Sequence, residues 1–105
     1  MILSEAVYTA TRRIPKGKVA TYADLARAIG RPMAWRHVGA ILSQNRDPRT
    51  PCHRVVRSDG RAGGFGFPGG TAKKIQKLER EGVEVRDGVI DLAHYRLPPR
   101  RIAAH

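Results

Sequence analysis

Apolar residues recur at helical spacing in the first part of the chain. Within residues 3–13 they fall on one face of a helix, at Leu3, Ala6, Val7 and Ala10. This spacing of three and four residues predicts an amphipathic helix. Pro15 and Gly17 are expected to end it, because proline lacks the N–H that a helix needs and glycine favours helix ends.

Two further helices are predicted at 22–29 and from Pro32 onward. Thr21 is a candidate N-cap for the first of them, and Asp24 completes the spacing of a capping box. Gly30 ends this helix, and Pro32 fits the first turn of the next. The inward face of that next helix is formed by Val38, Ile41 and Leu42. Two short helices around a Gly-containing turn are typical of a helix-turn-helix, with plain helical packing as the alternative.

The second half of the chain is richer in loops. Residues 45–70 contain six Gly and three Pro, with a short strand predicted at Val55–Val56. A helix is predicted at 72–81, with Ile75 and Leu78 facing inward and the lysines facing outward.

A hairpin is predicted at 83–90, around the turn Asp87-Gly88. Residues 98–105 form a predicted basic tail, which leaves residues 1–97 as one domain. The expected fold class is mostly α with short β strands, a winged-helix-like helix-turn-helix domain.

The charge of the chain indicates a polyanionic partner. Twenty Lys and Arg stand against nine Asp and Glu, which gives a formal net charge of +11. Such an excess opposes folding through self-repulsion and is typical of proteins that bind nucleic acid. A ribosomal or RNA-binding protein would have the same charge, so the charge limits the class of partner without identifying it.

The sequence also indicates where the protein works and what it does not bind. No apolar run is long enough for a membrane span, and the N-terminus does not have the pattern of a signal peptide. The single cysteine fits a reducing cytoplasm, so we expect a cytoplasmic protein, associated with the nucleoid if it is bacterial. One Cys and four His give no zinc spacing, and no metal or other cofactor is expected.

Cys52 is the candidate nucleophile. It lies in the segment Pro51-Cys52-His53-Arg54, where histidine or arginine could activate a thiol. Adjacent side chains on an extended strand point to opposite faces, so a Cys–His pair here needs a turn or a bridging water. The alternative is a buried structural cysteine, since free cysteine is among the most buried residue types.

Four segments resemble the O6-alkylguanine-DNA alkyltransferases. The residues Pro51 to Val55 are similar to the active-site signature of that family. The other three segments are Val19-Ala20-Thr21-Tyr22 with Leu25-Ala26, Arg36-His37-Val38-Gly39-Ala40 through Asn45, and Glu81-Gly82-Val83. They resemble the entry to its helix-turn-helix, its recognition helix with the asparagine hinge, and the end of its active-site helix. The similarity runs from about residue 2 to residue 85 and covers only the C-terminal, DNA-binding domain of the family.

This resemblance implies that a lesion base is flipped out of the duplex and that Cys52 takes the alkyl group from it. His53 would take the thiol proton through a water, Glu81 would orient the imidazole, and Asn45 would order the turn. Tyr22 would press on the DNA and Arg36 would fill the emptied stack. Further DNA contacts are expected from Thr21, Gly39, Ala40 and Arg54.

The segment 64–70 is longer than the pocket loop of the alkyltransferases. Pro68 lies where a backbone donor to the lesion oxygen is expected, and proline has no N–H. The lesion pocket is expected to include Phe65, Phe67, Pro68 and Gly69. The long loop and the ending at 89–95 are more similar to the alkyltransferase-like proteins, which bind alkylated guanine without repairing it and usually lack the cysteine.

Three functions therefore stay open. The first is stoichiometric transfer of the alkyl group from O6-alkylguanine in double-stranded DNA to Cys52, by a monomer. The second is a lesion-binding protein that flags the damage for nucleotide-excision-repair proteins. The third is a general basic DNA-binding or transcription-related protein, in which the cysteine signature is accidental.

Overall fold

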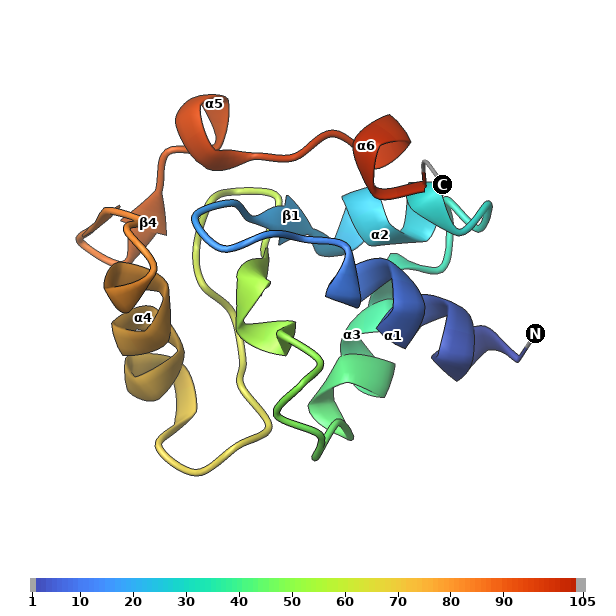
Figure 1. Ribbon diagram of the computed structural model, residues 1–105, viewed down its shortest axis with the longest axis horizontal. Coiled ribbons are helices and arrows are strands. Elements are labelled where there is room, and N and C mark those ends of the chain that lie inside the picture. The colour runs from blue at the N-terminus through green and yellow to red at the C-terminus, as the bar shows by residue number, and fades with distance from the viewer. Residues whose placement is uncertain (1, 104–105) are drawn as a thin grey trace.

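The computed structural model describes residues 2–103, and its core is built on three helices. They are α1 (Leu3–Arg12), α2 (Tyr22–Ala28) and α3 (Trp35–Ser43), which gather on one side of the molecule (Figure 1). Their inward residues form most of the main core, at Val7, Ala10, Leu25, Ala26, Val38 and Leu42, and Ile14 joins them from the turn after α1. Of the predicted apolar positions of the first and third helices, Val7, Ala10, Val38 and Leu42 are confirmed as buried, whereas Leu3, Ala6 and Ile41 are only partly buried.

The start of α2 is fixed as the sequence predicts. The hydroxyl of Thr21 accepts a hydrogen bond from the Asp24 N–H at 3.0 Å, and the Asp24 carboxylate accepts one from the Thr21 N–H at 3.0 Å. The capping box is confirmed. The prediction for the next helix was less accurate, because α3 begins at Trp35, and Pro32 lies in the turn before it.

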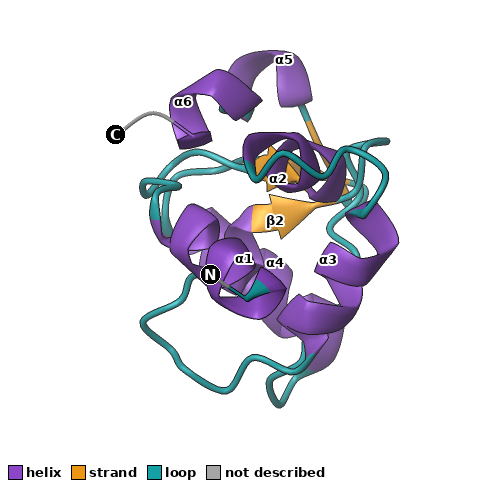
Figure 2. Ribbon diagram, turned by 90° about the vertical axis from the view of Figure 1, so that its right-hand side faces the viewer, coloured by secondary structure: helices purple, strands orange, loops and turns teal. Residues whose placement is uncertain are grey.

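A short parallel pairing joins the helix-turn-helix to the cysteine segment. Strand β1 (Ala20–Thr21) pairs with β2 (Val55–Val56), with Ala20 opposite Val55 and Thr21 opposite Val56. Directly before β2 lies a single 3-10 turn, η1 (Cys52–Arg54). Figure 2 shows this strand pair beside α2. Residues 20 and 55 are far apart in sequence. Their pairing brings the segment that contains Cys52 to the N-terminal end of α2.

The remaining elements flank this centre. Helix α4 (Gly70–Arg80) lies on the opposite side of the η1 segment from α1 and α3 (Figure 1), and the hairpin of β3 (Val85–Arg86) and β4 (Val89–Ile90) follows it. Asp87 and Gly88 have φ angles of 52° and 77°, so the predicted turn is confirmed. A second core cluster is formed by Val19, Val56, Leu78, Val83 and Ile90.

The C-terminal segment is part of the fold, and the prediction of a tail from residue 98 was wrong. After α5 (Leu92–Tyr95) the chain pairs with Val19, and the Leu97 N–H donates to the Val19 carbonyl at 2.8 Å. Helix α6 (Pro99–Ala103) then packs against α1 and α2 with Ile102 fully buried. Arg100 and Arg101 made this segment look like an exposed basic tail, although the apolar Ile102 that follows them is buried. Residues 104 and 105 of the predicted tail lie outside the described residues.

Within residues 2–103 no helix is long and apolar enough to cross a membrane. In the same residues no three His, Cys, Asp or Glu side chains are grouped as ligands for a metal ion.

Candidate functional site

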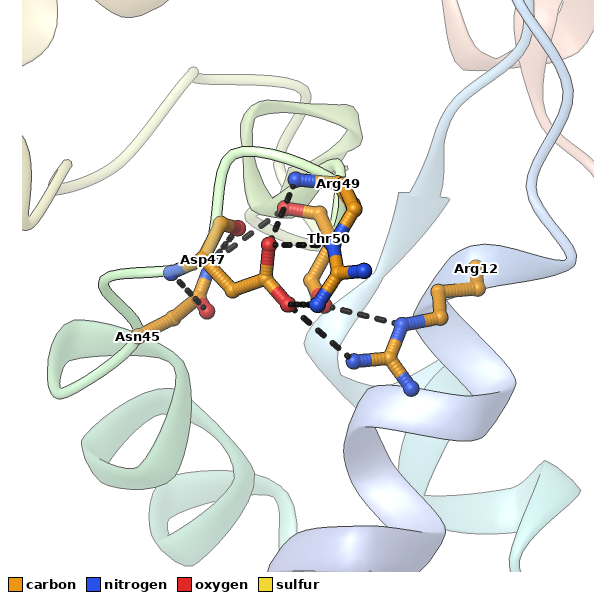
Figure 3. Close-up of polar contacts among 5 residues, drawn as sticks. All are labelled: Arg12, Asn45, Asp47, Arg49 and Thr50. Atoms are coloured by element: carbon orange, nitrogen blue, oxygen red, sulfur yellow. Dashed lines mark hydrogen bonds and ion pairs between the residues drawn. The ribbon is translucent and has the colours of Figure 1, made fainter.

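Asn45 orders the turn that carries Cys52. Its side-chain amide donates to the carbonyls of Asp47 and Thr50, both at 3.2 Å, and its Oδ1 accepts from the Asp47 N–H at 3.0 Å (Figure 3). The Thr50 carbonyl also accepts from the Cys52 N–H at 2.8 Å. Asn45 and Cys52 therefore share one acceptor, and Asn45 is 4% exposed, so these bonds are shielded from water.

The same loop is tied to α1 by charge. The Asp47 carboxylate accepts from the Arg49 guanidinium at 3.1 Å and lies 3.7 Å from that of Arg12. The Arg12 Nε donates to the Thr50 hydroxyl at 3.0 Å, as Figure 3 shows. The loop between α3 and η1 is thus held from both sides, and the turn before the cysteine has a defined shape.

His53, Glu81 and Arg54 form one buried network. The His53 Nε2 lies 3.0 Å from Glu81 Oε2, and the Arg54 guanidinium donates to both Glu81 oxygens at 2.7 and 2.9 Å. Burial would raise the pKa of Glu81, but the hydrogen bonds from Arg54 and His53 outweigh it and the pKa is lowered. Glu81 is therefore an ionised acceptor at neutral pH.

This network determines the protonation state and the tautomer of the His53 imidazole. Burial lowers the pKa of His53 below its ordinary 6.5, although Glu81 acts in the opposite direction, so the ring is neutral at pH 7. Because Glu81 can only accept, the proton of the neutral ring is on Nε2, which leaves Nδ1 as a free acceptor. His53 is thus in the form that can take a proton from a thiol, directly or through a water.

Arg54 is placed differently from the expected DNA contact. Its Nη1 donates to the Ile14 carbonyl at 2.7 Å, while the rest of the guanidinium binds Glu81, and the side chain is only 13% exposed. The 3-10 turn directs residue 54 inward, toward the end of α1. Arg54 is therefore a structural link between the ends of α1 and α4, and the sequence prediction for it was wrong.

Cys52 lies between two cavities. One, of about 220 Å³, is lined by Pro48, Thr50, Cys52, His53, Phe65, Phe67, Pro68, Lys73 and Lys77. The other, of about 360 Å³, is lined by Tyr22, Gly39, Leu42, Ser43, Cys52, Gly64, Phe65 and Gly66. Cys52 and Phe65 border both cavities. The turn thus points both Cys52 and His53 into one space, as a Cys–His pair requires.

Three of the four expected pocket residues line the first cavity, namely Phe65, Phe67 and Pro68. The two phenylalanine rings lie 5.3 Å apart. Gly69 is not among the lining residues, and instead is the N-cap residue before α4, with a φ of 100°. A Cβ at Gly69 would come within 2.6 Å of the Lys73 Cβ, so this glycine is required by the backbone.

Lys74 is a site residue that sequence reasoning missed. The lysines of α4 were expected to face outward, yet Lys74 is fully buried, and its ammonium donates to the Gly64 carbonyl at 3.0 Å and the Tyr22 hydroxyl at 3.3 Å. Burial lowers the pKa of Lys74 to about 8, with Cys52 acting in the opposite direction. Lys74 lies four residues before Leu78, on the same helical stripe, and this spacing was the available signal.

Tyr22 joins this group from the start of α2. Burial raises the pKa of its phenol, the nearby Cys52 adds to the effect, and Arg57 opposes it. Gly39 lies against the ring, since a Cβ there would be 3.8 Å from Tyr22 Cδ1. Gly39 thus lets α3 pack closely on Tyr22, and the two residues border the same cavity.

The other expected DNA contacts differ in exposure. Arg36, at the start of α3, and Ala40, one turn later, are exposed. The guanidinium of Arg36 lies 5.0 Å from the centre of the Trp35 ring. Thr21 is 4% exposed and its hydroxyl caps α2, so its side chain is occupied within the fold.

The fold and the site define a helix-turn-helix domain in which a buried cysteine lies beside a neutral histidine held by a glutamate. The sequence model of the family described as 6-O-methylguanine DNA methyltransferase, DNA binding domain, matches residues 3–83. The chain belongs to this family, and the resemblance read from the sequence and the predicted fold class are confirmed.

Two similar proteins and one solved structure illustrate the range of relatives. A bifunctional methyltransferase/endonuclease of Thermoplasma volcanium is 45% identical over 80% of this chain and 26% of its own length. Alkyltransferase-like protein 1 of Schizosaccharomyces pombe is 38% identical over 75% of this chain and 74% of its own. A crystal structure of that protein with damaged DNA containing O6-carboxymethylguanine has a TM-score of 0.82, with 32% identity, and covers 94% of this chain and all of that one. The chain thus spans about a quarter of the first relative and most of the second.

Proposed function

We propose that this chain binds O6-alkylguanine in duplex DNA, flips the base into the cavities beside Cys52, and transfers the alkyl group to the Cys52 sulfur. The observation that carries the proposal is the His53–Glu81 pair in the same buried site as Cys52. A neutral imidazole with a free Nδ1, oriented by an ionised carboxylate, is the arrangement that activates a nucleophile.

The reaction needs no cofactor. His53 Nδ1 takes the thiol proton through a water, and the Cys52 sulfur attacks the alkyl carbon. The bond between that carbon and the guanine O6 breaks, and its electron pair stays on the guanine. A proton then returns to the guanine from the imidazolium, so the products are a thioether and a repaired base. A thioether has no easy leaving group, so each protein reacts once.

Binding of the DNA rests on charge and on α3. The net charge of +11 favours the phosphate backbone. The exposed Arg36 would enter the stack that the flipped base leaves, and Tyr22 would support the displaced nucleotide from the floor of the second cavity. DNA-binding relatives, including the S. pombe protein solved with damaged DNA, support this assignment.

A second candidate function is lesion binding without transfer. Pro68 lines the cavity and has no N–H to donate to the lesion oxygen, and removing one such donor slows a reaction by about 100- to 1,000-fold. The similarity to an alkyltransferase-like protein also favours this candidate. In that case the bound protein would mark the site for excision-repair proteins.

Mass spectrometry after incubation with a duplex containing one O6-methylguanine tests the proposal. We expect a mass gain of one CH₂ at Cys52, at one per molecule, and none with the unmodified duplex. Cys52→Ser should abolish the gain and keep lesion binding, because binding depends on phosphates, the flipped base and Arg36. Glu81→Gln should slow the transfer. Tight, lesion-specific binding with unchanged mass after prolonged incubation would establish the second candidate.

A further inference from the structure

Two large apolar side chains are exposed at the start of the recognition helix α3. Met33 is 88% exposed and Trp35 is 46% exposed, and Arg36 follows directly. Scattered apolar residues on a surface are ordinary, so the groups that surround Trp35 decide whether it belongs to a binding surface.

The surroundings of Trp35 point to DNA. Trp35 borders a groove of about 540 Å³, whose other lining residues include Tyr22, Arg27 and Arg57. Tyr22 also borders the second cavity beside Cys52. The groove beside the start of α3 and the second cavity beside Cys52 therefore share one side chain, that of Tyr22.

The charge of this region argues against a second copy of the chain. Arg27, Arg36 and Arg57 are exposed, and Arg31 is exposed in the turn before α3. Two such surfaces would repel each other, whereas an aromatic ring among arginines is the usual combination for nucleic acid. Asp59 is the one acidic residue among those lining the groove, and it is paired with Arg57 at 3.1 Å.

Arg36 already uses the Trp35 ring in the free protein. Its guanidinium lies 5.0 Å from the ring centre, which is within range of a cation–π interaction. If Arg36 moves into the emptied stack, it leaves this face of the ring and the indole becomes available to the DNA. The movement of Arg36 thus exposes the Trp35 ring when the duplex is distorted.

We propose that Trp35 is a second wedge residue, which holds Arg36 before binding and presses on the base step beside the flipped nucleotide afterwards. Apolar wedges of this kind unstack a step and stabilise distorted DNA. The inference rests on the proposed function, because it requires a flipped base, and it assigns to Trp35 a role that its family motif does not include.

The test uses the fact that Trp35 is the only tryptophan of the chain. Its fluorescence should change on titration with an O6-methylguanine duplex and reach a plateau at one protein per lesion, with a smaller change on the unmodified duplex. Trp35→Ala should weaken binding to the lesion duplex by about 5- to 100-fold, the range for loss of one stacked aromatic. The loss on the unmodified duplex should be smaller.

Two variants serve as controls. Trp35→Phe should keep most of the affinity, and Val89→Ala removes another exposed apolar side chain, 39% exposed on the hairpin, and should change nothing. The salt dependence of binding should be equal in Trp35→Ala and wild type, since no charge is removed. Thermal unfolding of each variant checks that the fold is intact.

Equal losses on both duplexes, or wild-type binding by Trp35→Ala, would overturn the wedge role while leaving the proposed function in place. A wild-type protein that does not prefer the lesion duplex would overturn both. A change of oligomeric state in Trp35→Ala, seen by sedimentation without DNA, would instead assign this face to self-association and would also overturn the inference.

Discussion

The buried ammonium of Lys74 should make the fold less stable at neutral pH than at alkaline pH. The pKa of Lys74 is lowered by burial to about 8 from its ordinary 10.5. Below pH 8 the lysine is charged in both the folded and the unfolded protein, so the folded protein is destabilised by the full cost of burying the charge. Between about 8 and 10.5 the folded protein has lost a proton that the unfolded chain keeps, and stability rises with pH.

The size of the effect follows from the two pKa values. A tenfold change in the acid dissociation constant corresponds to about 1.4 kcal/mol. The difference between the folded and unfolded pKa of Lys74 is therefore worth about 3 kcal/mol in the free energy of unfolding. Lys74→Met removes the charge and keeps the apolar length. It should stabilise the protein near pH 7 by about 1 to 2 kcal/mol, because the loss of two hydrogen bonds of about 1 kcal/mol each offsets part of the gain.

Urea unfolding, followed by circular dichroism at several pH values between 7 and 10.5, measures both effects. The stability of wild type should rise relative to Lys74→Met across this range, and subtracting the variant removes the contributions of other titrating groups. Lys73→Met is the matched control, since that amine bonds to Gln76 in an exposed setting. Parallel pH profiles for wild type and Lys74→Met would refute the reasoning. Transfer to Cys52 should be slower in the more stable variant, because Tyr22 and Gly64 lose their link.

Three further outcomes are expected. Arg36→Ala should weaken lesion-duplex binding by about tenfold or more and unmodified-duplex binding less, as measured by fluorescence anisotropy, since an empty stack costs a few kcal/mol; equal losses would make Arg36 an ordinary phosphate contact. Asn45→Ala should destabilise the fold by about 2 to 3 kcal/mol in urea unfolding, because three hydrogen bonds of the Asn45 side chain are lost; an unchanged midpoint would contradict the role of Asn45 in the turn. Methyl, benzyl and bulkier O6 adducts should bind with similar affinity in a competition assay, because Phe65 and Phe67 offer apolar surface; a strong preference for methyl would show a closed pocket.

The sequence predicted best those features that depend on neighbouring residues. The capping box of Thr21 and Asp24 and the turn at Asp87 were predicted correctly because the interacting groups lie within three residues of each other. The elements that bring Cys52, His53 and Glu81 together required the resemblance to a family, since no local rule relates residue 53 to residue 81.

The errors concern side chains whose partners are distant in sequence. Arg54 was assigned to DNA, but the carbonyl of Ile14, 40 positions earlier, draws it inward. Lys74 was assigned to solvent by its charge, although its partners are in two other segments. Residues 98–103 were predicted to form a tail from their arginines, while one buried residue, Ile102, decides their position. Charge alone predicts exposure poorly where a buried acceptor exists.

The bonds of Asn45 have a consequence for protein engineering. Asn45 follows the end of α3 almost directly, and its amide holds the Thr50 carbonyl to which the Cys52 N–H is bonded. The helix-turn-helix and the turn that carries Cys52 are therefore not separable modules in this chain. A graft that exchanges α3 for the helix of a relative has to extend through residue 51 and keep the contacts of Arg12. A shorter graft would exchange α3 and reposition Cys52 in one step.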